Sequence, residues 1–171
     1  MVSYMSLLFL SGSLLKNDNP VKLHGYTSAQ GAEVTREKIA QDINARFNAG
    51  VDKNDIYMTC GAAASLTISI NALACDGDEF IAIAPFFPEY RVFVEAAGAK
   101  FVVVEADTQK FQIDFDKLKS AISPNTKAVI INTPNNPTGV VLSEDTIKKC
   151  EYVTVISVGS EYFIRAIKSK E

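Results

Sequence analysis

Residues 80–106 read FIAIAPFFPEYRVFVEAAGAKFVVVEA, and the fold can be argued outward from this pattern. Short runs rich in β-branched and aromatic residues, Phe80–Ala84 and Phe101–Glu105, predict two strands. Between them, Pro88–Ala97 has apolar residues at helical spacing, and a helix tolerates proline in its first turn. The predicted buried stripe of this helix consists of Tyr90, Phe93, Val94 and Ala97. A strand, a helix and a second strand in this order predict a right-handed crossover between parallel strands.

The same alternation of strand and helix patterns extends along the chain in both directions. Further β-rich runs predict strands at Ile56–Cys60, Ala128–Asn132 and Tyr152–Val158. Further helical patterns lie at Ala62–Ala74, Phe115–Ile122 and Ser143–Cys150. Strands that alternate with helices form a parallel sheet covered by helices on both faces. We therefore predict the α/β class, with a mainly parallel sheet flanked by helices.

The first twenty residues predict a separate arm. Their apolar run, Met5–Leu10, is too short to span a bilayer, and no basic residue precedes it as a signal peptide would require. The loop-forming residues Asn17–Pro20 follow. We therefore predict an N-terminal arm over residues 1–20 and one α/β domain over residues 21–171.

Two further helices are predicted near the ends of this domain. A helix from Gly31 stops at Gly50, with Ile39, Ile43 and Phe47 on its apolar face and Arg36 off that face. A short amphipathic helix is expected just before the polar tail that begins at Ile167.

Composition excludes several classes of function. The 171 residues are 47% hydrophobic and carry a net charge of −3, so no basic surplus would attract nucleic acid or anionic lipid. Three cysteines are too few for a disulfide framework and suit a reducing compartment, which predicts a cytoplasmic protein. With His24 as the single histidine, neither a zinc site nor a Ser-His-Asp triad is expected, and we predict no metal.

Three turns at predicted carboxyl ends of strands carry unusual residues, and ligands of α/β sheets bind there. In the first, Thr59–Ser65, Gly61 allows a tight turn, and the small residues Ala62 and Ala63 begin the next helix. Exposed N–H groups and the helix dipole would make this a phosphate site. The same small residues could instead serve only to let the helix pack close to the sheet.

The other two turns are rich in aromatic residues or in asparagine and proline. Ala84–Tyr90 places Phe86 and Phe87 between prolines, either as a platform for a flat heterocycle or as core rings. Asn132–Gly139 has two prolines that stiffen the backbone and asparagine amides that can donate to an oxygen. This last loop is the strongest functional signal in the chain.

The stretch Asn132–Gly139 resembles the hallmark loop of the pyridoxal-phosphate (PLP) enzymes of the aspartate aminotransferase type, fold type I, class I/II. The asparagine before Pro-Thr-Gly in that family bonds the cofactor's phenolic oxygen, which implies this role for Asn136. Pro85–Tyr90 is similar to the family's aromatic loop and implies that Phe87 stacks on the pyridine ring. The resemblance covers about residues 21–149 and implies part of the family's large domain.

The same resemblance implies a phosphate site and a partner subunit. Thr59–Leu66 is similar to the family's phosphate-binding turn, which implies cofactor contacts at Gly61, Ala62 and Ala63. The segment from Tyr26 to Ala40 is similar to one whose tyrosine reaches the cofactor phosphate of the partner subunit, which implies that role for Tyr26. The expected activity is transfer of an amino group between an amino acid and a 2-oxo acid, by a homodimer that binds no nucleic acid or membrane.

Two features of the family pattern have no match. The aspartate that pairs with the pyridine nitrogen would follow the last predicted strand, but no aspartate follows Asp145. The Schiff-base lysine segment is not matched, because Lys168 and Lys170 stand in a polar tail. We therefore name no catalytic residue and expect the chain alone not to turn over. The alternative is a non-catalytic, truncated or engineered α/β module with at most weak PLP or phosphate binding.

Overall fold

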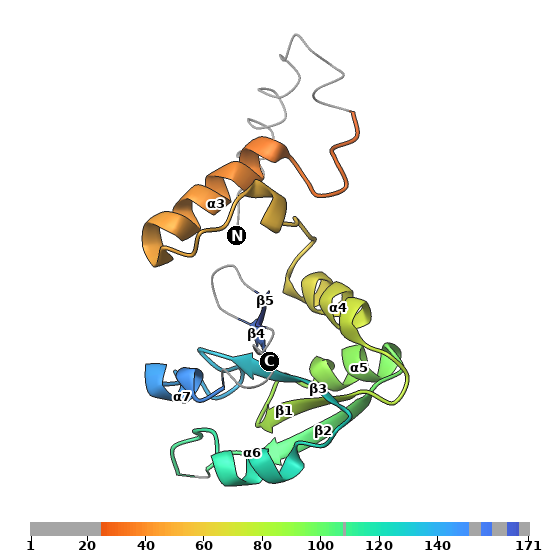
Figure 1. The fold of residues 1–171 in the computed structure, drawn as a ribbon, viewed down its shortest axis with the longest axis vertical. Coiled ribbons are helices and arrows are strands. Elements are labelled where there is room, and N and C mark those ends of the chain that lie inside the picture. The colour runs from red at the N-terminus through yellow and green to blue at the C-terminus, as the bar shows by residue number, and fades with distance from the viewer. Residues whose placement is uncertain (1–24, 108, 151–154, 159–163, 168–171) are drawn as a thin grey trace, which may run out of the picture. The chain divides into compact units, whose positions relative to one another are not determined.

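The computed structural model describes residues 25–107, 109–150, 155–158 and 164–167 (Figure 1). The chain divides into two compact units, residues 1–58 and 59–171. The predicted arm over residues 1–20, the first residues of the Tyr152–Val158 run, and Lys168 and Lys170 lie outside the described residues. The predicted boundary between arm and domain therefore stays a prediction. Within the described ranges, no helix has the length and apolar character that crossing a membrane requires.

The first unit contains helix α3, Glu33–Phe47, and a single 3-10 turn, η1, Lys53–Asp55. Ala40 and Ile43 of the helix pack against Ile56, and the partly buried Ile39 and Val51 complete this small cluster. The Asn44 amide donates to the Val51 carbonyl at 2.7 Å and accepts from the Val51 N–H at 3.0 Å. These bonds fold the segment that follows α3 back against the helix.

The second unit contains a five-stranded sheet whose strands are mainly parallel. In chain order its elements are α4 (Ala62–Leu73), β1 (Glu79–Ala84), α5 (Glu89–Ala96), β2 (Lys100–Glu105), α6 (Phe115–Ala121), β3 (Thr126–Asn132), α7 (Glu144–Lys148), β4 (Val155–Val158) and β5 (Ile164–Ile167). The strand order is β2-β1-β3-β4-β5. All pairs are parallel except β4 with β5, which is antiparallel. The predicted α/β class with helices on both faces is confirmed.

The alternation of side chains along the central strands explains why both faces need helices. On one face, Phe80 and Ala82 of β1 pack with a set of buried residues from α4 and α5: Leu66, Ile70, Tyr90 and Val94. On the other face, Ile81 of β1 packs with Val129 of β3 and Leu118 of α6. Successive side chains of a strand point to opposite faces, so a strand buried on both sides is apolar throughout.

Three sequence-based expectations about local structure are wrong. No strand forms over Ile56–Cys60, where Met58 N–H makes a single bond to the Gln30 carbonyl at 2.9 Å instead of entering a ladder. Residues 164–167 form a strand paired with β4 rather than a helix. On α3, Arg36 is buried, whereas Phe47 is 59% exposed, which reverses the face predicted for these two residues.

Candidate functional site

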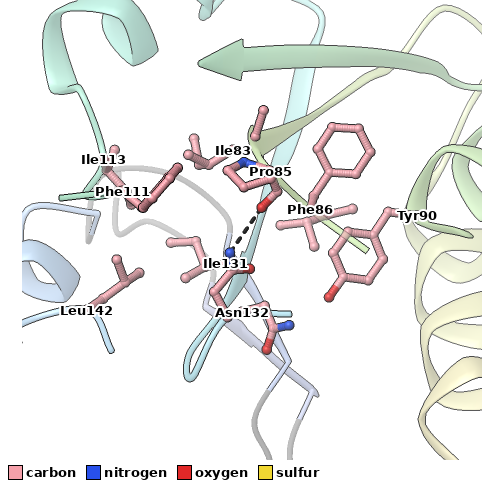
Figure 2. A pocket seen from close by; sticks show the side chains of 12 residues that line it. Ile83, Pro85, Phe86, Tyr90, Phe111, Ile113, Ile131, Asn132 and Leu142 are labelled. Atoms are coloured by element: carbon pink, nitrogen blue, oxygen red, sulfur yellow. Dashed lines mark hydrogen bonds between the residues drawn. The ribbon is translucent and has the colours of Figure 1, made fainter. Parts of the chain in front are cut away.

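The candidate site is built on the carboxyl ends of β1 and β3, which are neighbours in the sheet. β1 ends at Ala84 and leads into the aromatic loop, and β3 ends at Asn132 and leads into the Asn-Pro loop. The Asn135 amide nitrogen donates to the Pro85 carbonyl at 3.0 Å, and Figure 2 shows this bond as a dashed line. Two loops that are far apart in the sequence are therefore joined directly above the sheet edge.

The Asn-Pro loop, residues 132–140, is held by its own hydrogen bonds. The Asn135 backbone N–H donates to the Val140 carbonyl at 2.8 Å, and its carbonyl accepts from the Gly139 N–H at 2.7 Å. The Asn135 amide also donates to the Thr138 hydroxyl at 2.9 Å. By contrast, the Asn136 side chain is exposed and makes no hydrogen bond to any residue that the structure describes. The two adjacent asparagines thus differ, since the amide of Asn135 is hydrogen-bonded, whereas that of Asn136 has no partner among the described residues.

Both rings of the aromatic loop are half-buried and pack on the core. Phe86 stands edge-on to Phe101 with ring centroids 5.1 Å apart, and Phe87 stands edge-on to Tyr90 at 5.7 Å. Neither ring is fully enclosed. The question left open by the sequence, platform or core, therefore has a mixed answer, because each ring rests on the core and keeps part of its surface free.

Tyr90 links the aromatic loop to the end of β3. Its side chain is buried, with 3% of the residue exposed, and burial raises the pKa of its hydroxyl to about 12. A side-chain hydrogen bond with Asn132 acts in the opposite direction on this pKa but is the smaller effect. Figure 2 shows the Tyr90 hydroxyl directed toward the Asn132 amide. Tyr90 is therefore a neutral hydrogen-bonding group under ordinary conditions.

A small pocket opens beside these loops (Figure 2). Its wall is mainly apolar, with polar groups from Tyr90, Asn132 and Asn135. Phe86 lines it, whereas none of the six predicted cofactor residues does. Sequence analysis singled out the loops but not these individual residues. The signal was present, since Asn132 and Asn135 belong to the Asn-Pro motif.

The amino end of α4 is the third part of the site. Gly61 precedes the helix with a φ of 102°, and no side chain caps the helix. The first helical bond runs from the Ser65 N–H to the Gly61 carbonyl at 3.2 Å, so the N–H groups of residues 62–64 have no acceptor among the described residues. Ala62 and Ala63 are exposed. Free donors and the positive end of the helix dipole suit an anion.

This helix end lies on the same side as the two loops. Only residues 74–78 separate α4 from β1, and both elements contribute to one core cluster, so the strand runs back along the helix. Figure 1 shows the amino end of α4 on the side toward which the arrowheads of β1 and β3 point. The uncapped amino end of α4, the half-buried Phe87 ring and the exposed Asn136 side chain therefore share one edge of the sheet.

Tyr26 is placed in the first unit and is fully exposed. It precedes a turn in which the Gly31 N–H donates to the Ser28 carbonyl at 2.8 Å. The buried Arg36 guanidinium donates to the Gly31 carbonyl at 3.2 Å and to the Lys53 carbonyl. This turn is thus anchored to α3 and to the segment that follows it, and the Tyr26 ring projects from it into solvent.

Comparison with known proteins identifies the family. The family model "Aminotransferase class I and II" matches residues 15–154. A probable aspartate aminotransferase from Methanocaldococcus jannaschii is 35% identical over 85% of this chain and 40% of that protein. The tyrosine aminotransferase of Dictyostelium discoideum is 30% identical over 90% of this chain and 36% of that protein.

A solved structure agrees with these relatives. The amino transferase of Eubacterium rectale superposes with a TM-score of 0.81 and 48% identity, over 86% of this chain and 40% of that one. The chain thus spans about 36–40% of the length of these relatives. Because the family model matches most of its residues, the chain belongs to the class I and II aminotransferases.

Proposed function

We propose that this chain supplies the phosphate- and ring-holding part of a PLP site in an enzyme that transfers an amino group between an amino acid and a 2-oxo acid. The observation that supports the proposal best is the exposed Asn136 amide, which has no partner among the described residues and lies on the same sheet edge as the uncapped amino end of α4. Membership of the family makes PLP the expected cofactor. Phe87, on the neighbouring loop, completes the proposed set.

The groups on this edge fit most of the cofactor's needs. The N–H groups at the start of α4 suit its dianionic phosphate, and the Asn136 amide can donate to its ring oxygen. Phe87 offers an aromatic surface that a flat ring can stack on. The family also has a carboxylate that pairs with the pyridine nitrogen. Among the residues that the structure describes after β4, which are 164–167, there is no carboxylate. The proposed residues would therefore contact the phosphate, the ring oxygen and one face of the ring.

Each of these backbone and side-chain groups would have a distinct role in binding the cofactor. The backbone at Gly61, Ala62 and Ala63 would bind the phosphate, and Phe87 would cover one face of the ring. Asn136 would hold the ring oxygen and so fix the ring's rotation about the phosphate. When bound, PLP supplies an electron sink for bonds at the substrate's α-carbon, while the protein supplies binding and orientation.

Binding of PLP to the 171-residue chain tests the role of Asn136. Equilibrium dialysis is carried out on the parent, on Asn136→Ala, and on Asn125→Ala as the matched exposed asparagine at the other end of β3. Loss of a hydrogen bond to a partly charged oxygen should weaken PLP binding about tenfold or more in Asn136→Ala. Asn125→Ala should bind like the parent. Equal affinity of Asn136→Ala and the parent would refute the assignment.

The phosphate contact can be tested by removing one donor. Proline is well tolerated at the first helical position, which is Ala62, so Ala62→Pro deletes a single N–H and keeps the helix. We expect unchanged stability and weaker binding of both PLP and inorganic phosphate. If binding of both ligands is unaffected in a folded Ala62→Pro protein, the anion is not held at this helix end.

We further propose a cytoplasmic homodimer in which Tyr26 reaches the cofactor phosphate of the partner subunit. The full exposure of Tyr26 and the anchored turn behind it support a role outside its own unit. Cys60 and Cys75 are free and exposed, which suits a reducing compartment. Sedimentation tests the dimer. Tyr26→Phe should weaken PLP binding only under conditions in which the dimer forms, and a monomer with parental affinity would contradict the proposal.

A further inference from the structure

We propose that Asn135 is a positioning residue that couples the aromatic loop to the Asn-Pro loop and thereby sets Phe87 relative to Asn136. The inference rests on the proposed function for its consequence, but the coupling itself is a property of the chain without any ligand. Asn135 contacts neither ring nor phosphate in the proposed arrangement. It acts through the two loops that carry those contacts.

Both N–H groups of the Asn135 side-chain amide donate hydrogen bonds. An amide nitrogen carries two hydrogens, and here one is directed to the Pro85 carbonyl at 3.0 Å and the other to the Thr138 hydroxyl at 2.9 Å. Its backbone N–H and carbonyl are bonded to Val140 and Gly139. Asn135 is thus fixed within its own loop, and its bond to Pro85 transmits that position to a residue fifty places earlier in the chain.

The acceptor side of this bond is equally constrained. Pro85 follows directly on β1 and stands two residues before Phe87, whose carbonyl accepts from the Tyr90 N–H at 3.0 Å. Phe87 also rests edge-on against the Tyr90 ring. Because little free chain lies between the Pro85 carbonyl and the Phe87 ring, movement at Pro85 moves the ring. The hydrogen bond between Asn135 and Pro85 therefore lies close to both proposed cofactor contacts. Asn136 is one residue after Asn135, and Phe87 is two residues after Pro85.

Hydrogen exchange on the ligand-free 171-residue chain tests the coupling. Asn135→Asp keeps the size of the side chain but replaces the donor by an oxygen that faces the Pro85 carbonyl. Loss of this partly buried hydrogen bond should speed local exchange about fivefold to tenfold, both in residues 86–90 and in residues 135–140. Thr138→Val is the matched variant, because its hydroxyl accepts only from the Asn135 amide and the Val140 N–H, both inside the Asn-Pro loop, so exchange should rise in residues 135–140 alone.

A second control separates coupling from general loss of stability. Asn71→Asp removes a similar amide-to-carbonyl bond, to Thr67 at 2.8 Å, within α4. Asn71→Asp should leave the rate of hydrogen exchange in residues 86–90 unchanged. If Asn135→Asp lowers overall stability, Asn135→His is measured beside it. An imidazole Nδ1–H can donate from the same distance along the side chain, so exchange in residues 86–90 should be as slow in Asn135→His as in the parent.

The outcomes are distinct. Faster exchange in residues 86–90 for Asn135→Asp, but not for Thr138→Val, supports the coupling. Exchange that changes only in residues 135–140, or equally in both variants, overturns it. PLP affinity is then measured by dialysis and should fall about fivefold in Asn135→Asp. Absence of PLP binding by the parent would sink the proposed function and leave the exchange result standing.

Discussion

Replacing Gly31 by alanine should destabilise the first unit more than the same change at Gly61 destabilises the second. Both glycines have a positive φ, 95° and 102°, where an alanine pays roughly 1–3 kcal/mol of backbone strain. The two positions differ in the space available for an added Cβ atom. A Cβ on Gly31 would stand 2.5 Å from Met58 Cγ and 2.6 Å from Met58 Cβ, whereas one on Gly61 would meet no atom within 4 Å.

The difference in space sets the expected magnitude. Overpacking of this kind costs typically 1–3 kcal/mol, so Gly31→Ala should lose about 2–6 kcal/mol in all, whereas Gly61→Ala should lose only the roughly 1–3 kcal/mol of backbone strain. The Met58 Cβ is part of the collision and cannot turn away as a side-chain end can. Met58→Ala should therefore rescue Gly31→Ala only in part, and Met58→Gly should rescue the whole collision apart from its own backbone cost.

Urea unfolding followed by circular dichroism, with hydrogen exchange of α3 to report the first unit, measures these losses. The midpoint should shift most for Gly31→Ala, without a change in slope. Equal losses at Gly31 and Gly61 would refute the argument, since they would show that backbone strain accounts for both. The same conclusion would follow if Met58→Gly failed to recover any stability in the Gly31→Ala background.

Three further changes have expected outcomes. Phe80 is fully buried in the sheet core, so Phe80→Ala should cost about 3–5 kcal/mol in urea unfolding, and a loss below 1 kcal/mol would contradict this burial. Hydrogen bonds from Lys100 and then Ser123 lower the pKa of Glu79 below its ordinary value of 4.5. Because the folded pKa is the lower one, this contribution is present above pH 4.5 and is lost as the pH falls through the folded pKa, so Glu79→Gln should flatten the acid limb of a stability–pH curve. The Asp114 carboxylate caps α6 by accepting from the Asp116 and Lys117 N–H groups, so Asp114→Ala should lower stability by about 1 kcal/mol, while Asp114→Asn, itself a good cap, should not.

Periodicity in the sequence was sufficient for the sheet unit and insufficient for the first unit. The runs at Phe80–Ala84, Phe101–Glu105 and Ala128–Asn132 match β1, β2 and β3 within two residues at either end. β1 and β3 are buried on both faces, so their continuous apolar character is a direct record of the packing. Boundaries of α4 and α5 were similarly close, because a buried stripe at helical spacing ends where the packing ends.

The failures occur where one contact decides the local structure. Ile56–Cys60 has the composition of a strand, but only Ile56 is buried, and the strand pairs of the described residues do not include this segment. The charge of Arg36 predicts a position off the apolar face of the helix, yet its guanidinium donates to two backbone carbonyls inside the first unit. Phe47 was assigned to the core because it is apolar, yet it stands at the helix end with the Arg46 guanidinium over its ring. Such polar anchoring leaves no periodic signal.

The Asn-Pro loop shows the same limit inside the candidate site. The sequence points to the loop and, through the family resemblance, implies a role for Asn136, but it does not show what the preceding asparagine does. The two residues have identical side chains and differ only in what the fold places within reach. For Asn135 this is the Pro85 carbonyl, supplied by a strand that is adjacent in the sheet and distant in the chain. In the proposed arrangement the Asn136 amide contacts the cofactor while both N–H donors of the Asn135 amide hold the loop in place, and this division between the two residues is visible only once β1 and β3 lie side by side.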